Sequence, residues 1–300
     1  MSTQRRLLPV VAITGSSIMV GCGGYSGSSC GFGSYGSYGS YGSYGSYGSL
    51  AAAAKRTRVR RVKRAGSKTS ANASATGYAA GCPGAFGLGA DGIYEGTLST
   101  GTSQPGNPVF AIIDVNGDGR MSAQDGTYYR LTLSAVSTSV SGTFTGYSQG
   151  VNVPNGSLTT TGSLSAMLTP PGMDGTLTDQ GGNGQMLALN FDNTYILGSS
   201  LATLVGTWNY SANGFSLTAT IQTDGTFTAL DASGCSYSGS FGLIDPNFNT
   251  YSESYTRSCN GTSLQFTGLA SYFPAAGTSA AQIMLLADDD AGQYLAAILK

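Results

Sequence analysis

The segment Phe215-Ser216-Leu217-Thr218-Ala219-Thr220-Ile221 alternates apolar and polar residues with a period of two. This period places every second side chain on the same face of an extended strand. Gln222-Thr223-Asp224-Gly225 follows, with the Asp-Gly pair that closes tight hairpins, before Thr226 and Phe227 resume the alternation. Similar short runs, separated by Gly, Asn-Gly or Asp-Gly, continue from about Tyr78 to the end. We therefore predict an all-β body of antiparallel strands, arranged as a barrel or a sandwich.

The body of the chain repeats itself once. Five blocks recur in the same order: residues 92–94 and 206–208, 118–123 and 224–229, 126–133 and 234–241, 144–146 and 266–268, and 185–187 and 282–284. Tyr195 and Tyr294 follow the last pair. We predict two tandem β-meanders, residues 78–199 and 200–300, either as two small domains or packed together as one. Short helices are expected near Ser199 and Ser279.

The first residues have the pattern of an export signal. Arg5 and Arg6 precede a short apolar run, Leu7 to Val20, and a small residue, Gly21, stands before Cys22. Met19-Val20-Gly21-Cys22 resembles the lipobox of bacterial lipoproteins. The resemblance implies a signal peptide over residues 1–21 and a diacylated Cys22, with Gly23 permitting sorting to the outer membrane. The alternative is an ordinary cleaved signal.

Residues 22–77 predict a disordered tether. Six aromatic-Gly-Ser repeats fill residues 32–49, and no apolar spacing there could bury one face. A run of eight basic residues follows between Lys55 and Lys68. On an exported chain these charges favour anionic lipid or lipopolysaccharide phosphates, and no nucleic acid is expected. A solvated spacer is the alternative.

Composition disfavours an enzyme. The chain has no histidine, the commonest general base and metal ligand. All fifteen acidic residues lie at Asp91 or later, where the cations are Arg120, Arg130, Arg257 and Lys300. Without histidine, catalysis would need paired carboxylates such as Asp224 and Asp231, and nothing around them indicates it. Asp288-Asp289-Asp290 is interpreted as a solvated turn.

One stretch matches a calcium loop. Residues 114–125 place oxygen-bearing groups at the spacing that such a loop needs, with Gly119 at its sharp turn. The candidate ligands are Asp114, Asn116, Asp118, Arg120 (through its carbonyl), Ser122 and Asp125. The loop resembles those of EF-hands and dockerins, and implies a weak structural Ca²⁺ site. The alternative is a plain hairpin, because the flanks are strand-like and the second copy turns with only Thr223-Asp224-Gly225. No cofactor is required.

The cysteines predict one disulfide. Residues 237–241 and 251–255 can pair as a hairpin, which brings Cys235 and Cys259 together at its ends. Outside the cytoplasm such a pair forms a disulfide. Cys30 and Cys82 flank the tether, and they either close it into a loop, stay free or cross-link chains.

Two further motifs carry a resemblance. Gly92-Ile93-Tyr94-Glu95-Gly96-Thr97-Leu98 and Gly234-Cys235-Ser236-Tyr237-Ser238-Gly239 look like a group of uncharacterised proteobacterial lipoproteins. The entry Leu204-Val205-Gly206-Thr207-Trp208 is similar to bacterial lipocalin-like domains. The resemblance implies a fold and an envelope location, on the periplasmic face or the cell surface. It identifies no established activity, and the protein partner stays unknown.

The leading hypothesis is a lipid-anchored, non-catalytic binding or structural module. The alternatives are a carrier of a small apolar ligand in a lipocalin-like barrel and, less favoured, an envelope enzyme. The barrel interior separates the first two. A cavity of several hundred Å³ would favour carriage, and a packed interior would exclude it.

Overall fold

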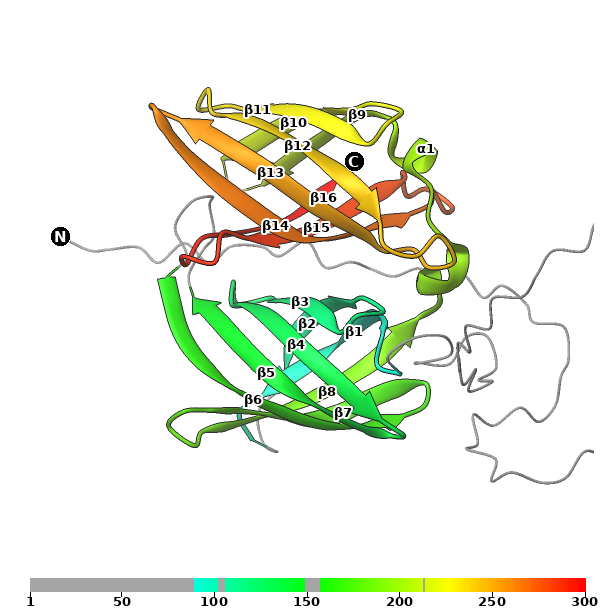
Figure 1. The fold of residues 1–300 in the computed structure, drawn as a ribbon, viewed down its shortest axis with the longest axis vertical. Helices are drawn as coiled ribbons and strands as arrows, with labels where there is room; N and C mark the ends of the chain where they lie inside the picture. The colour runs from blue at the N-terminus through cyan, green and yellow to red at the C-terminus, as the bar shows by residue number, and fades with distance from the viewer. Residues whose placement is uncertain (1–88, 102–105, 149–156, 213) are drawn as a thin grey trace, which may run out of the picture. The chain divides into compact units, whose positions relative to one another are not determined.

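The computed structural model describes residues 89–101, 106–148, 157–212 and 214–300. The predicted signal peptide, the predicted lipidation site Cys22, the basic run at 55–68, and Cys30 and Cys82 all lie outside these residues. The described part is almost entirely antiparallel sheet, in two tandem sets of eight strands (Figure 1). The predicted all-β fold with two tandem meanders is therefore confirmed.

The first eight strands form a closed barrel in which each strand pairs with the next. They are β1 (Gly92–Ser99), β2 (Asn107–Ile113), β3 (Asp118–Ala123), β4 (Tyr128–Val136), β5 (Ser139–Ser148), β6 (Ser157–Thr169), β7 (Gly172–Asp179) and β8 (Gly184–Asp192). Closure comes from β1, which pairs with β8 from Ile93↔Asp192 to Ser99↔Met186. Because the sheet closes on itself, it has no free edge.

The second set has the same simple order. Its strands are β9 (Gly206–Ala212), β10 (Phe215–Ile221), β11 (Thr226–Asp231), β12 (Ser236–Leu243), β13 (Tyr251–Cys259), β14 (Thr262–Phe273), β15 (Gln282–Asp288) and β16 (Tyr294–Leu299). Two backbone hydrogen bonds of 2.8 Å, exchanged between Asn209 and Lys300, join its first and last strands. We call it the second barrel.

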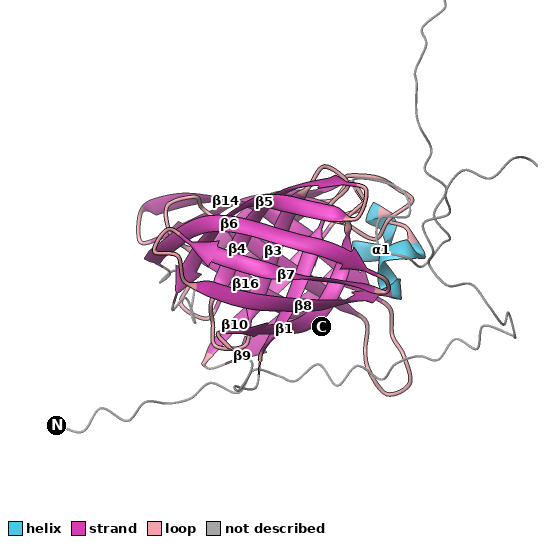
Figure 2. Cartoon of the chain, turned by 90° about the horizontal axis from the view of Figure 1, so that it is seen from below, coloured by secondary structure: helices cyan, strands magenta, loops and turns pink. Residues whose placement is uncertain are grey.

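The connection between the barrels is the helical part of the described chain. A 3₁₀ helix, η1 (Asn193–Leu197), is capped by the Asp192 side chain, and the short helix α1 (Leu201–Leu204) follows (Figure 2). Helix near Ser199 is thus confirmed. The expectation of helix near Ser279 is wrong, because the chain there makes a small bridge between Ala276 and Ser279. Neither helix in the described residues has the length or apolar character to cross a membrane.

Period-two alternation fills each barrel. On β10 the side chains of Leu217, Ala219 and Ile221 enter the second core, while Ser216 and Thr218 are exposed. The first core is built likewise, for example from Leu164, Ala166 and Leu168 on β6.

Hydrogen bonds and register show which residues of the two barrels are equivalent. Tyr94 pairs with Ala111 as Trp208 pairs with Ala219. The Tyr94 hydroxyl donates to the Ala90 carbonyl at 3.0 Å, and the Trp208 indole donates to the Leu204 carbonyl at 2.8 Å. Each ring thus ties its barrel to the carbonyl four residues earlier.

The β3–β4 and β11–β12 turns also match. The Gly126 amide donates to Ala123, and the Gly234 amide donates to Asp231, both at 3.0 Å. This places Tyr129 at the position of Tyr237, as the alignment of residues 126–133 with 234–241 predicted.

The other repeat blocks are misplaced. Leu133 bonds to the Gly117 carbonyl as Phe241 bonds to that of Gly225, so the match of 118–123 with 224–229 is displaced by two residues. Residues 144–146 lie on β5, but 266–268 lie on β14, the counterpart of β6. Residues 185–187 lie on β8, but 282–284 lie on β15, the counterpart of β7. In these two blocks, similar sequences therefore lie on strands whose positions in the two barrels differ by one.

Aromatic rings connect the outer faces of the two barrels. Tyr128 on β4 stacks on Tyr294 of β16 at 4.8 Å between centroids, and Tyr195 of η1 stacks on Phe248 at 4.8 Å. Both pairs belong to one buried cluster that includes Ile112, Leu269 and Leu286. The two barrels therefore share a third core beside their own interiors.

Candidate binding site

The first barrel contains a cavity of about 460 Å³ at one mouth. This mouth is where β1, β3, β5 and β7 end and where their partners begin. The residues that line it are Thr100, Tyr129, Phe144, Thr160, Leu177, Asp179, Asn183, Gly184 and Gln185. In volume this is a small-molecule cavity. By contrast, a space inside the second barrel measures about 20 Å³, room for roughly one water.

The registers explain why one barrel is hollow and the other filled. Tyr129 faces Gly146 on the neighbouring strand, whereas its equivalent Tyr237 faces Arg257. Gly146 in turn pairs with Thr160, where Arg257 pairs with Leu264. The first barrel thus lacks the side chains that fill this level of the second.

The neighbouring layer of inward-facing side chains also has a glycine in the first barrel where the second has a bulky residue. Phe144 pairs with Gly162, whereas its equivalent Tyr255 pairs with Phe266 and stacks on it at 5.0 Å. At Gly162 an added Cβ would lie 2.1 Å from the Thr178 carbonyl oxygen and 2.6 Å from the Phe144 ring, so a larger residue does not fit beside that ring. Two glycines and a threonine therefore create the cavity.

The lining combines apolar surface with polar groups. The Phe144 ring lies edge-on to Tyr129 at 5.8 Å, and Leu177 adds apolar surface. The Tyr129 hydroxyl donates to Gln185 Oε1 at 3.2 Å, which leaves the Gln185 amide hydrogens and the phenolic oxygen lone pairs for a ligand.

The charge at this mouth is negative. Hydrogen bonds from the Asn183 side chain and backbone hold the pKa of Asp179 below its usual value, so the carboxylate stays ionised. Burial, and secondarily the negative charge of Asp125, raise the pKa of Tyr129 to about 12. The described lining residues include no lysine or arginine. An anionic ligand would be repelled here, whereas a neutral or cationic one would not.

The proposed calcium ligands are not brought together. Asp114 and Asn116 lie in the β2–β3 turn, where Asp114 Oδ1 accepts the Asn116 and Asp118 amides at 2.9 Å. Asp125 lies in the β3–β4 turn and accepts the Thr127 amide. Between them β3 is extended, so the turns are separated by roughly 17 Å at about 3.3 Å per residue. One ion cannot contact both turns. In the described residues no cluster of three or more cysteine or acidic side chains is placed to hold a metal.

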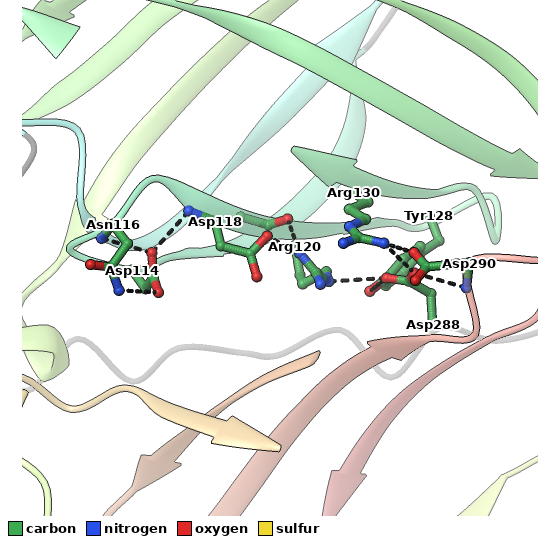
Figure 3. A network of polar contacts seen from close by, with 9 residues as sticks. Asp114, Asn116, Asp118, Arg120, Tyr128, Arg130, Asp288 and Asp290 are labelled. Carbon is green, nitrogen blue, oxygen red and sulfur yellow. Dashed lines mark hydrogen bonds and ion pairs between the residues drawn. The ribbon is translucent and has the colours of Figure 1, made fainter. Parts of the chain in front are cut away.

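Asp118, Arg120 and Ser122 occupy alternate positions of β3, whose other face enters the first core through Met121 and Ala123. Arg120 therefore uses its side chain rather than its carbonyl. Its side chain is 1% exposed, and its guanidinium pairs with Asp118 and has Nε 3.0 Å from Asp288 Oδ2 of the second barrel (Figure 3).

The interpretation of residues 288–290 as a solvated turn is wrong for Asp288. It is fully buried, accepts the Tyr128 hydroxyl at 3.1 Å and lies 3.5 Å from Arg130. Asp290 is exposed and pairs with Arg130. Asp288 thus joins the two barrels, while its neighbour meets solvent.

Glu253 is a buried carboxyl that sequence reasoning missed. It is 3% exposed, faces the second core beside Tyr251 and Tyr255, and has no hydrogen-bond partner for either oxygen among the described residues. Burial raises its pKa to about 8, against the opposing charge of Arg120. The sequence does not indicate that Glu253 is buried, because its inward orientation follows only from the register of β13.

The remaining predicted residues separate into one confirmed pair and one unsupported pair. The Cys235–Cys259 disulfide is present, with 4.5 Å between Cα atoms. Asp224 lies in the turn before β11 and Asp231 is the last residue of that strand, so they do not form a carboxylate pair. Sequence reasoning also missed the cavity residues, and aligned Tyr129 and Gln185 only as parts of the repeat. The available signal was glycine at 146 and 162, which has meaning only once the register is known.

Comparison of the chain with protein-family models, with curated proteins and with solved structures finds no match.

Proposed function

We propose that this protein is a non-catalytic binding module, held at a membrane by lipid on Cys22, whose first barrel takes a small ligand. The observation that supports the binding role is the cavity of about 460 Å³ at the mouth of that barrel. The packed second barrel serves as structural support. The calcium site forms no part of the proposal, because Asp114 and Asp125 lie at opposite ends of β3.

The lining defines the class of ligand. Phe144 and Leu177 fit an apolar ring or face, and Tyr129, Gln185 and Thr160 fit hydroxyl or amine groups. Because Asp179 is ionised and the described lining has no cation, the ligand is neutral or positively charged. The cavity thus favours a small amphipathic molecule over the purely apolar ligand expected from the lipocalin resemblance.

Three probes of nearly equal shape test this. Benzyl alcohol is neutral, benzylamine is cationic and benzoate is anionic. In ligand-observed NMR we expect the first two to bind the folded protein and benzoate to bind at least about tenfold more weakly, because burying a carboxylate near Asp179 is unfavourable. Absence of binding by all three, or preference for benzoate, would contradict the proposal.

Filling the cavity is expected to abolish binding. Thr160 lines the cavity, and Leu264 is its equivalent in the second barrel. Thr160→Phe places a ring in the cavity and should weaken benzyl alcohol binding by more than about tenfold. Ser163→Phe is the matched control, since it adds the same ring on the exposed face of β6. Equal affinity of both variants would place the probe elsewhere.

The anchor is tested separately. The lipobox resemblance predicts that mass spectrometry of the membrane fraction will find Cys22 diacylated at the mature N-terminus. Cys22→Ser should move the protein to the soluble fraction, because two or more acyl chains are needed for stable attachment. An intact Met1 or an unacylated N-terminus would disprove the anchor and leave the cavity proposal untouched.

A further inference from the structure

The two sulfurs of the Cys235–Cys259 disulfide have different surroundings. Cys235, just before β12, is fully buried. Cys259 ends β13, is only partly buried, and is followed by the exposed residues Asn260 and Gly261. An incoming reagent therefore reaches the sulfur of Cys259 more easily than that of Cys235.

The buried sulfur accepts a hydrogen bond from a cation. Arg257 Nη2 lies 3.3 Å from Cys235 Sγ. Ser233 Oγ lies at the same distance, but its one hydroxyl hydrogen is donated to Asp231. Arg257 is fixed in turn, with Nε 3.1 Å from the Tyr237 hydroxyl and its guanidinium carbon 5.9 Å from the Tyr237 ring centre. A disulfide sulfur accepts hydrogen bonds weakly, whereas a thiolate carries a full charge and accepts them strongly. This arrangement fits a Cys235 thiolate better than it fits the disulfide.

No carboxylate of the described residues pairs directly with the Arg257 guanidinium. Arg257 is 6% exposed and forms no ion pair within 4.0 Å among the described residues, unlike Arg120 and Arg130. The closest acidic group in this network is Asp231, which reaches Arg257 only through the Tyr237 hydroxyl.

Asp231 opposes a negative sulfur, but its charge is spread over several donors. It accepts the Ser233 hydroxyl at 2.6 Å, the Tyr237 hydroxyl at 2.9 Å, and the amides of Ser233 and Cys235. Burial alone would raise its pKa, yet these hydrogen bonds hold the pKa of Asp231 below its ordinary value. The carboxylate thus stays ionised, with its charge stabilised by these donors, and Arg257 remains available to Cys235.

We propose that Cys235–Cys259 is a thiol-exchange site for low-molecular-weight thiols, with Cys259 as the attacked sulfur and Cys235 as the leaving sulfur. The thiolate of the incoming thiol forms a bond to Cys259 Sγ, and the Cys235–Cys259 bond breaks. Its electron pair stays on Cys235 Sγ as a thiolate beside Arg257. Return attack by that thiolate on Cys259 expels the thiol and restores the disulfide, so the modification is reversible.

Glutathione is the probe for this test. The folded full-length chain is incubated with glutathione, quenched with acid and alkylating reagent, and digested for mass spectrometry. We expect the mixed disulfide on Cys259 and the free thiol on Cys235, with roughly a tenfold or greater preference. Glutathione on Cys235, or equal amounts on both, would overturn the proposal.

Arg257→Met tests the leaving-group role. We expect it to slow formation of the mixed disulfide by roughly tenfold, because the leaving thiolate loses its cation, while Arg257→Lys keeps most of the rate. A purely structural Arg257 would give the opposite result, since a loosened fold exposes the bond and speeds exchange. Unchanged or faster exchange in Arg257→Met, or equal slowing in Arg257→Lys, would refute the assignment.

Discussion

Replacing Glu253 by glutamine is expected to stabilise the protein in alkaline solution by several kcal/mol. In the folded state burial raises the pKa of Glu253 to about 8, from an ordinary value of 4.5. Between these values the folded chain binds the extra proton, so stability falls as pH rises, by about 1.4 kcal/mol per pH unit. The contribution is complete below pH 4.5, is lost progressively up to about pH 8, and stays lost above it. Glutamine is never ionised and removes this dependence.

The measurement is urea unfolding of wild type and Glu253→Gln from pH 4 to pH 9. The two should have nearly equal stability at pH 4 and diverge steadily towards pH 8. Glu95→Gln is the matched control because Glu95 is the chain's other glutamate and is only half-buried. A difference between wild type and Glu253→Gln that does not vary with pH would show that Glu253 is solvated or paired.

Removing Arg120 is expected to cost about 3–5 kcal/mol of folding free energy, the usual result of breaking a buried ion pair. Arg120 is 1% exposed, and its partner Asp288 is completely buried. Arg120→Met keeps the apolar stem but leaves the Asp288 carboxylate with the more distant, partly exposed Arg130 and the Tyr128 hydroxyl. The loss is therefore mainly the cost of an underpaired buried charge.

A double-mutant cycle in urea isolates that cost. Asp288→Asn should recover a large part of the stability lost in Arg120→Met, because it removes the stranded charge and keeps a partner for Tyr128. Arg130→Met is the control, and since Arg130 is 34% exposed its loss should stay within about 1 kcal/mol. If Arg120→Met costs no more than Arg130→Met, the buried pair does not hold the barrels together.

The fold was largely predictable because its signals are local. Alternation over residues 215–221 and the Asp-Gly turn after them specify one hairpin, and repeated signals specify a meander. The disulfide followed from a hairpin between 237–241 and 251–255; β12 and β13 form that hairpin, with 237–241 opposite 253–257, two residues from the predicted register. Matching the two copies block by block was less successful. Strands of similar composition occupy different positions in the two barrels, one strand apart, and nothing in the local sequence shows this.

The site was not predictable for a related reason. The calcium interpretation depended on spacing, but β3 extends through the middle of that spacing and separates Asp114 from Asp125. Asp288 was interpreted as solvated because its partner Arg120 lies far away in sequence. The cavity depends on what Gly146 and Gly162 lack, and this becomes visible only when the registers of the two barrels are compared.

Trp208 is the chain's one tryptophan, and it lies in the second barrel with its ring edge-on to Tyr272 at 6.3 Å. Its fluorescence therefore reports on that barrel alone, while the cavity belongs to the other. A ligand that enters the first barrel and changes the emission of Trp208 must act across the contacts between the barrels, which include the Arg120–Asp288 pair and the shared third core. A ligand that leaves the emission unchanged while it protects the first barrel from heat would show that the two halves respond independently. One indole thus serves as a built-in optical probe of communication between the duplicated halves.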